Sequence, residues 1–204
     1  MAILLIRHGE TLLNAARTLQ PADTGLSARG HAQARALAGR LAKAGVAAIV
    51  SSDLPRAAST AEALADATGL PIRWEPLLRE RNFGDLRGRP YDGLGFDPLT
   101  LVHAPPGGES AETFRMRVAQ AFQKIVALRR GLDGDLAVVT HGLVIAAMLE
   151  SHAGSARAES GPSRLANTSV TVISARSPHA VERLNCTAHL EAEIGDDPAS
   201  LSGG

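Results

Sequence analysis

Short apolar runs alternate with longer stretches of helical period along most of this 204-residue chain. Strands separated by helices pair in parallel, and the helices then cover both faces of the sheet. The alternation therefore predicts an α/β fold, a three-layer α/β/α sandwich with a mostly parallel central sheet. The expected strands are 2–6, 47–52, 71–75, 135–140, 169–175 and 180–185, and the expected helices are 27–45, 54–68, 110–131 and 142–150.

The last two expected strands differ from the others, because a short turn at Ser177-Pro178-His179 joins them. The second of the pair alternates in polarity, which is typical of an exposed edge, so we expect an antiparallel hairpin. No internal repeat or low-complexity linker divides the chain. We expect a single domain over 1–190, followed by a loosely held tail over 191–204 that is rich in Asp, Ser, Pro and Gly.

Charge and cysteine content narrow the possible partners and the compartment. Lysine plus arginine equals aspartate plus glutamate at 21 each, which argues against nucleic acid or an anionic membrane as a partner. The single cysteine, Cys186, forms no internal disulfide, and no segment approaches the ~20 apolar residues of a membrane span. We expect a cytoplasmic protein without a membrane partner. Its oligomeric state is not predicted.

Charged and ring side chains follow four of the expected strands where those strands end. Arg7 and His8 follow the first strand, Arg56 lies shortly after the second, Glu80 follows the third, and His141 follows the fourth. Ligands of open α/β sheets bind at the carboxyl ends of the strands. We therefore expect all five side chains at one rim of the sheet.

A tetrahedral anion is the ligand that suits this set of side chains. Arginine binds phosphoryl oxygens through two parallel hydrogen bonds, and its charge stabilises a transferring phosphoryl group. Gly142 opens the last expected helix, whose free N–H groups also favour an anion. The set predicts a phosphate site.

Seven blocks of sequence, in order along the chain, resemble the histidine phosphatase superfamily, in its phosphoglycerate mutase-like branch. Any one of the blocks alone, such as R-H-G, recurs by chance, whereas the ordered set is specific. The blocks are "RHGET" with Asn14, "LSARGHAQA", "SSDLPRAASTAEALA", "LRERNFGDLRG", "PPGGES", "VVTHGLVIAAML" and "NTSVTVI".

This resemblance implies a role for each residue at the rim. His8 would be the nucleophile that forms a phosphohistidine, and Glu80 would be the proton donor, with Asp85 as the nearest competing acid. The resemblance further implies that Arg7, Arg56 and His141 surround the phosphoryl group, that Thr11, Asn14, Gly142 and Arg81 bind phosphate or substrate, and that no metal or cofactor takes part.

The segment after the proposed acid favours one activity over another. Residues 90–108 contain no lysine or arginine and several apolar side chains, which suits hydrolysis of a small phosphate ester with a partly apolar or sugar-like alcohol. A 2,3-bisphosphoglycerate-dependent phosphoglycerate mutase remains the alternative, because Arg81, Arg87 and Arg89 lie just before this segment and offer a second anion site.

Two readings from other classes also remain open. His8, His141 and Glu80 form a two-histidine, one-carboxylate set that suits a divalent metal, although arginines beside it oppose cation binding. A phosphate-binding module without catalysis is the other reading. Loss of the nucleophile or the acid is expected of such a module, and both are present here.

Overall fold

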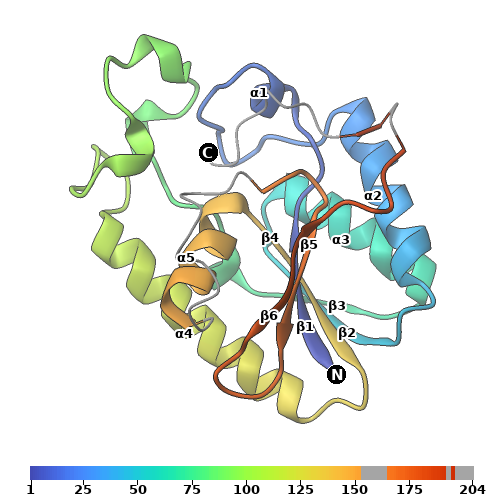
Figure 1. Ribbon diagram of the computed structural model, residues 1–204. Helices are drawn as coiled ribbons and strands as arrows, with labels where there is room; N and C mark the ends of the chain where they lie inside the picture. The colour runs from blue at the N-terminus through green and yellow to red at the C-terminus, as the bar shows by residue number, and fades with distance from the viewer. Residues whose placement is uncertain (153–164, 192–193, 196–204) are drawn as a thin grey trace.

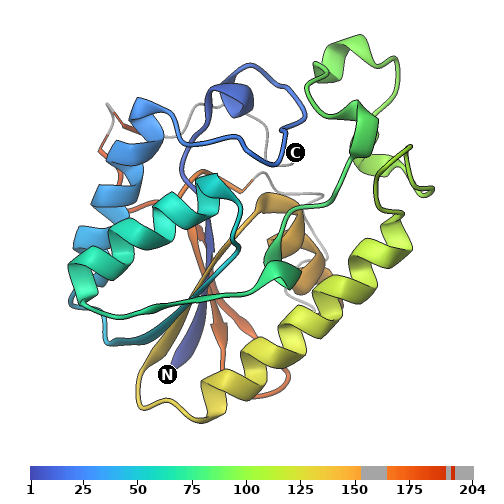
Figure 2. The same cartoon turned by 180° about the vertical axis from the view of Figure 1, so that it is seen from behind.

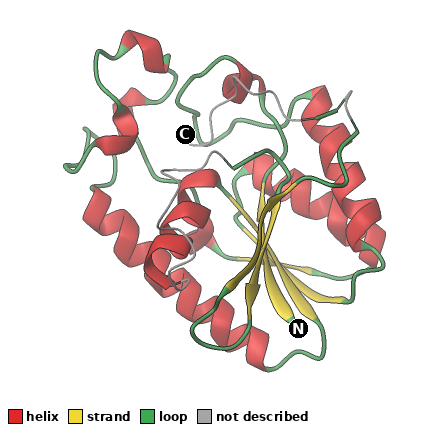
Figure 3. Cartoon of the chain, viewed as in Figure 1, coloured by secondary structure: helices red, strands yellow, loops and turns green. Residues whose placement is uncertain are grey.

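The computed structural model describes residues 1–152, 165–191 and 194–195. Within this part of the chain, six strands form one mixed sheet in the order β3-β2-β4-β1-β5-β6, and helices cover both of its faces (Figures 1 and 3). The predicted α/β sandwich is confirmed. The strands are β1 (Ala2–Arg7), β2 (Val46–Ser51), β3 (Ile72–Trp74), β4 (Asp135–Thr140), β5 (Val170–Ser174) and β6 (Val181–Cys186).

The four strands that are separated by helices pair in parallel, and the last two strands pair antiparallel. β1 pairs in parallel with β4, β4 with β2, and β2 with β3. β5 runs antiparallel to β1, and β6 runs antiparallel to β5, so the expected C-terminal hairpin forms one edge of the sheet. The register places Arg7 opposite Thr140. The parallel strands therefore end together, at the upper end of the sheet in Figure 1.

The helices divide between the two faces, as the two opposite views in Figures 1 and 2 make clear. α2 and α3 cover one face, and α4 and α5 cover the other. Ser27 and Ser110 cap the N-termini of α2 and α4, each accepting a hydrogen bond from a backbone N–H three residues on. The helices are α1 (Leu12–Ala15), α2 (Ala28–Leu41), α3 (Pro55–Thr68), α4 (Ala111–Arg130) and α5 (Gly142–His152).

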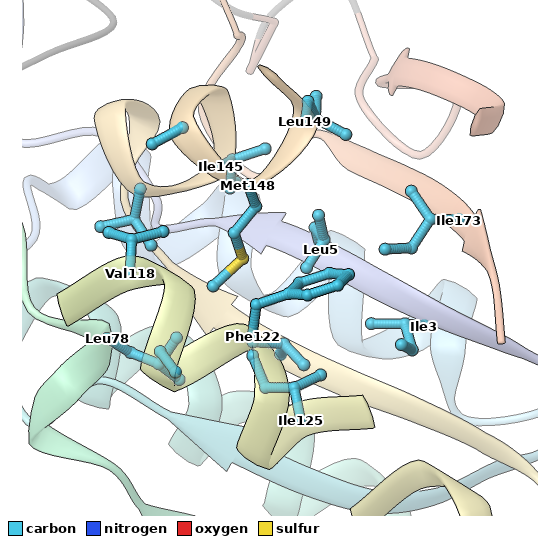
Figure 4. Packing of buried hydrophobic residues seen from close by; sticks show 14 of the residues in the cluster. Ile3, Leu5, Leu78, Val118, Phe122, Ile125, Ile145, Met148, Leu149 and Ile173 are labelled. Atoms are coloured by element: carbon cyan, nitrogen blue, oxygen red, sulfur yellow. The ribbon is translucent and has the colours of Figure 1, made fainter. Parts of the chain in front are cut away.

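Alternation along the central strands gives each face its own apolar core. Ile3 and Leu5 of β1 pack with α4 and α5 around Phe122 and Met148 (Figure 4). The residues between them, such as Leu4, point to the opposite face and pack against α2 and α3. Because both faces are buried, the strands read as continuous apolar runs in the sequence.

Some short elements and one boundary were not predicted. α1 and four short 3₁₀ turns, the latter at 76–78, 84–86, 91–93 and 98–100, interrupt segments without a clear period. The helix expected to reach Gly45 ends at Leu41. Most of the predicted tail over 191–204 lies outside the described residues.

Candidate active site

The ends of three parallel strands are joined by backbone hydrogen bonds just beyond the sheet. His8 N–H donates to the Thr140 carbonyl at 3.0 Å, and Ser52 N–H donates to the Val139 carbonyl at 3.0 Å. The loops that leave β1, β2 and β4 therefore start side by side. This fixes the first residue of each loop relative to the others.

His8 and His141 face each other at this point. Their ring centroids lie 5.1 Å apart, with the ring planes tilted by 58°, and both residues are buried. His8 Nδ1 lies 2.7 Å from the carbonyl oxygen of Gly9. Because a carbonyl only accepts hydrogen bonds, this contact assigns the proton to Nδ1 and leaves the lone pair on Nε2.

The surroundings keep both rings neutral. Burial holds the pKa of His8 well below its usual value of 6.5, and the charges of Arg56 and Arg7 lower it further. Burial, Arg56, His8 and Arg7 act in the same direction on the pKa of His141. An uncharged imidazole with a lone pair on Nε2 is the form in which a histidine attacks phosphorus.

Arg56 lies on the first turn of α3 and is 1% exposed. Burial lowers its pKa to about 10, so the guanidinium remains charged at neutral pH. Arg56 Nε and His141 Nδ1 are both buried, and neither has a hydrogen-bond partner within the described part of the chain. Buried polar atoms are normally paired. One such atom on His141 and another on Arg56, whose charge acts on both histidines, indicate a place built for a polar ligand.

Glu80 reaches this cluster from the segment after β3. Its two carboxylate oxygens accept hydrogen bonds from the backbone N–H groups of Arg81, at 3.0 Å, and of Leu143, at 3.1 Å, in the first turn of α5. These bonds and the charge of Arg56 favour the ionised form. Burial outweighs them and raises the pKa of Glu80. Burial therefore favours the protonated form of this carboxyl group.

Arg117 on α4 holds the segment that carries Glu80, and sequence reasoning missed it. Its guanidinium donates to the carbonyl oxygens of Leu77, Arg79 and Glu80 and forms an ion pair with Glu109 at 2.8 Å. The signal was an arginine beside the apolar stripe of a helix, a position that normally carries a core residue.

The histidine-bearing loop after β1 rests on the N-terminus of α2. A Cβ on Gly30 would lie 2.0 Å from the Glu10 carbonyl oxygen, so only glycine allows this approach. Glu10 N–H donates to the side-chain oxygen of Gln33 at 2.9 Å, and the Ser27 hydroxyl donates to the Glu10 carboxylate at 2.8 Å. The "LSARGHAQA" block therefore positions the loop.

Thr11 and Asn14 shape the next turn of the same loop. Thr11 caps α1, and the Asn14 side chain accepts from the Thr11 backbone N–H at 3.2 Å. Both residues are buried. Gly142 is the first residue of α5, directly after His141. Their expected part in phosphate binding stays a prediction.

Arg81 has contacts of another kind. Its guanidinium donates to the carbonyl oxygens of Leu101, at 2.7 Å, and of Glu109, at 3.2 Å, and it lies 5.2 Å from the centroid of the Phe83 ring. These contacts fasten two loops together. Its expected role in substrate binding also stays a prediction.

Part of the apolar segment after Glu80 packs inward, whereas Phe96 and Val102 are exposed. Tyr91 is buried against Leu19 and Phe83, and Leu94 and Leu99 pack on the same cluster. Leu19 N–H also donates to the Arg89 carbonyl at 3.1 Å, and Gly88 N–H donates to the Leu19 carbonyl at 2.7 Å. This small third core therefore ties the loop after β1 to the segment that follows Glu80.

Comparison with known proteins accounts for this arrangement. A family model of the histidine phosphatase superfamily (branch 1) matches residues 3–187. The chain belongs to this superfamily. The relatives described next match over nearly their whole length.

Three relatives illustrate the range of names given to proteins that resemble this chain. A protein of Yersinia pestis named "Probable phosphoglycerate mutase GpmB" is 33% identical, over 97% of this chain and 98% of its own. The mycobacterial glucosyl-3-phosphoglycerate phosphatase is 30% identical, with a TM-score of 0.75 over 91% of this chain and 98% of that one. Phosphoglycerate mutase from Bacillus anthracis is 26% identical, with a TM-score of 0.78 over 93% and 94%. Histidine phosphatases similar to this chain are thus named both as hydrolases and as mutases.

Proposed function

We propose that this chain is a phosphomonoester hydrolase that acts on a small phosphorylated metabolite through a phosphohistidine on His8. The observation that carries the proposal is the state of His8: a buried, neutral imidazole with its proton on Nδ1, facing His141 between two arginines. Nδ1–H stays on the Gly9 carbonyl while Nε2 attacks phosphorus. That bond supports the positive charge that develops on the ring.

The reaction divides into two displacements. In the first, the bond between Nε2 and phosphorus forms, the phosphorus–oxygen ester bond breaks, and Glu80 gives its proton to the departing alcohol. In the second, Glu80 takes a proton from water, the water oxygen bonds to phosphorus, and the nitrogen–phosphorus bond breaks. Arg7, Arg56 and His141 stabilise the phosphoryl oxygens in both steps.

Similar solved structures support a phosphate site. The mycobacterial phosphatase has been solved with inorganic phosphate and with VO3, and those two structures are 30% and 31% identical to this chain. We assign the same kind of ligand to the place beside His8 and His141. The unpartnered Arg56 Nε and His141 Nδ1 are the donors it would meet.

The proposed chemistry needs no metal ion. Within residues 1–152, 165–191 and 194–195, no three His, Cys, Asp or Glu side chains lie together as metal ligands would. A metal-dependent hydrolase would lose its activity in excess chelator. We expect turnover to persist there.

A mutase remains the second candidate, because the curated relative from Yersinia pestis carries that name. Both activities share the phosphohistidine and differ in what accepts the phosphoryl group. A mutase assay with 2,3-bisphosphoglycerate, run beside a phosphate-release assay on the same preparation, separates them. Faster transfer to phosphoglycerate than to water would favour the mutase.

Trapping the intermediate tests the proposal. Native protein mixed with a labelled phosphate ester and quenched in alkali should retain an acid-labile label, and His8→Ala should retain none. His31→Ala, an exposed histidine on α2, is the matched control and should label normally. Label that persists in His8→Ala would place the nucleophile elsewhere. Phosphate binding without label or turnover on a broad set of esters would instead favour a binding module.

A further inference from the structure

A pocket of about 470 Å³ opens beside the proposed acid. Glu80 forms part of its wall, together with residues of the loop after β1, the start of α3 and the segment before α4. Because Glu80 is the proposed proton donor to the departing alcohol, the alcohol part of a substrate would occupy this pocket. The side chains of its wall therefore influence which phosphate esters the protein accepts.

Three arginines line the pocket, and two of them are already neutralised. Arg79 forms an ion pair with Asp53 through both Nε and Nη2. Arg117 forms an ion pair with Glu109 through Nε and Nη2, each bond 2.8 Å long. Neither pair leaves a net charge for a ligand.

Arg87 is the third arginine, and its charge is not balanced. It is half-buried on the pocket wall, and its guanidinium makes no hydrogen bond or ion pair with any residue that the structure describes. The charge of Arg87 contributes to lowering the pKa of Arg56, so it acts within electrostatic range of the phosphate site. When Glu80 holds its proton, Arg87 gives the pocket one net positive charge.

We infer that Arg87 is a specificity-determining residue that binds an anionic group, a carboxylate, on the alcohol part of the substrate. A carboxylate matches one guanidinium through two parallel hydrogen bonds and carries one charge, whereas a second phosphate would require more cations than the pocket has free. The inference rests on the proposed function. It adds a carboxylate to the expected partly apolar or sugar-like alcohol; Tyr91 and Leu99, which suggested the apolar part, pack into the third core.

Two inhibitors that differ only in the carboxylate test this assignment. 3-Phosphoglycerate and glycerol 3-phosphate would compete with p-nitrophenyl phosphate, and Ki would be measured for the native protein, Arg87→Gln and Arg87→Lys. We expect Arg87→Gln to raise Ki for 3-phosphoglycerate roughly 10- to 100-fold, the usual effect of losing a hydrogen bond to a charged group. Arg87→Lys keeps the charge but cannot form the two parallel hydrogen bonds. Its Ki for 3-phosphoglycerate should lie between those of the native protein and of Arg87→Gln.

The controls separate this inference from the proposed function. In Arg87→Gln, Ki for glycerol 3-phosphate and KM for p-nitrophenyl phosphate should change by one shared factor, well below the change for 3-phosphoglycerate, because neither ligand carries the carboxylate. A circular dichroism spectrum of the variant checks its folding. Arg115→Gln, which removes an exposed arginine of α4, should change neither inhibitor. Equal effects on both inhibitors, or none, would overturn the role of Arg87 alone. A native protein that neither turns over p-nitrophenyl phosphate nor labels His8 would overturn the proposed function.

Discussion

The imidazole rings of His8 and His141 lie 5.1 Å apart, between centroids, although the two residues are distant in sequence. Each follows the last residue of a strand, and these last residues, Arg7 and Thr140, are paired in register. Neighbouring strands lie ~4.8 Å apart, so the next residue on each strand starts at nearly that separation. The parallel pairing of β1 and β4 therefore sets the width of the site.

Arg56→Ala should slow turnover by about 10²–10³, because it removes one preorganised donor to the phosphoryl oxygens. Inorganic phosphate should also protect the variant less against thermal unfolding, since binding to the folded state is weaker. Steady-state kinetics and melting curves with and without phosphate measure both effects. Arg35→Ala, at an exposed site on α2, should behave as the native protein. A change in rate below threefold would mean that Arg56 does not contact the transition state.

Glu80→Gln should slow hydrolysis of an alkyl phosphate by ~10²–10⁴, because an alkoxide leaves poorly without a proton. With p-nitrophenyl phosphate, whose leaving group needs no proton, the loss should shrink to less than about tenfold. Since the pKa of Glu80 is raised, the native rate on alkyl esters should fall on the alkaline side as this group ionises, and the variant should lack that fall.

Asp85→Asn is the matched control for this experiment. Asp85 is the nearest competing acid in the sequence, and in the structure it is exposed. The variant should retain the native rate on both esters. If Asp85→Asn shows the dependence on leaving group and Glu80→Gln does not, the acid has been assigned to the wrong residue.

Stability should fall as the solution becomes acidic. His8 and His141 titrate well below 6.5 when folded and near 6.5 when unfolded. Above this pH neither state binds the protons. Below it the unfolded chain binds them first, so each histidine removes up to ~1.4 kcal/mol per pH unit from the free energy of unfolding. Glu80 opposes this trend, because its raised pKa lets the folded state hold a proton that the unfolded state has released.

His141→Gln isolates one part of this dependence. Urea unfolding between pH 7 and pH 5 should give a shallower loss of stability than in the native protein, whatever the absolute stability of the variant. His31→Gln changes an exposed histidine and should keep the native dependence. An unaltered slope in His141→Gln would show that His141 is protonated in the folded chain.

Gly30→Ala should destabilise the fold by roughly 1–3 kcal/mol, because the new Cβ would meet the Glu10 carbonyl at 2.0 Å. The loop that carries His8 must shift, so turnover should fall as well. Gly39→Ala lies on the same helix with open space around its Cβ, and it should stabilise by about 0.5–1 kcal/mol. Denaturant titrations of both variants make the comparison. Equal effects would mean that the close approach is not real.

Much of the candidate site at the rim of the sheet was predictable, because strand ends are local features of a sequence. Arg7, His8 and His141 follow apolar runs directly, and the parallel order of those runs places their ends together. The proton position on His8 was not predictable, because it depends on the direction of the Gly9 carbonyl. The contacts of Arg81 and Arg117 join segments that are distant in sequence, so their partners were not predictable; the only local signal was the place of Arg117 beside the apolar stripe of its helix.

The third core has a consequence for motion. Leu19 belongs to the loop that starts at the nucleophile, and the backbone around Gly88 and Arg89 belongs to the segment that starts at the acid. Because hydrogen bonds and packing around Phe83 fasten the two, neither loop can swing outward alone. The nucleophile-side and acid-side loops therefore form one mechanical unit.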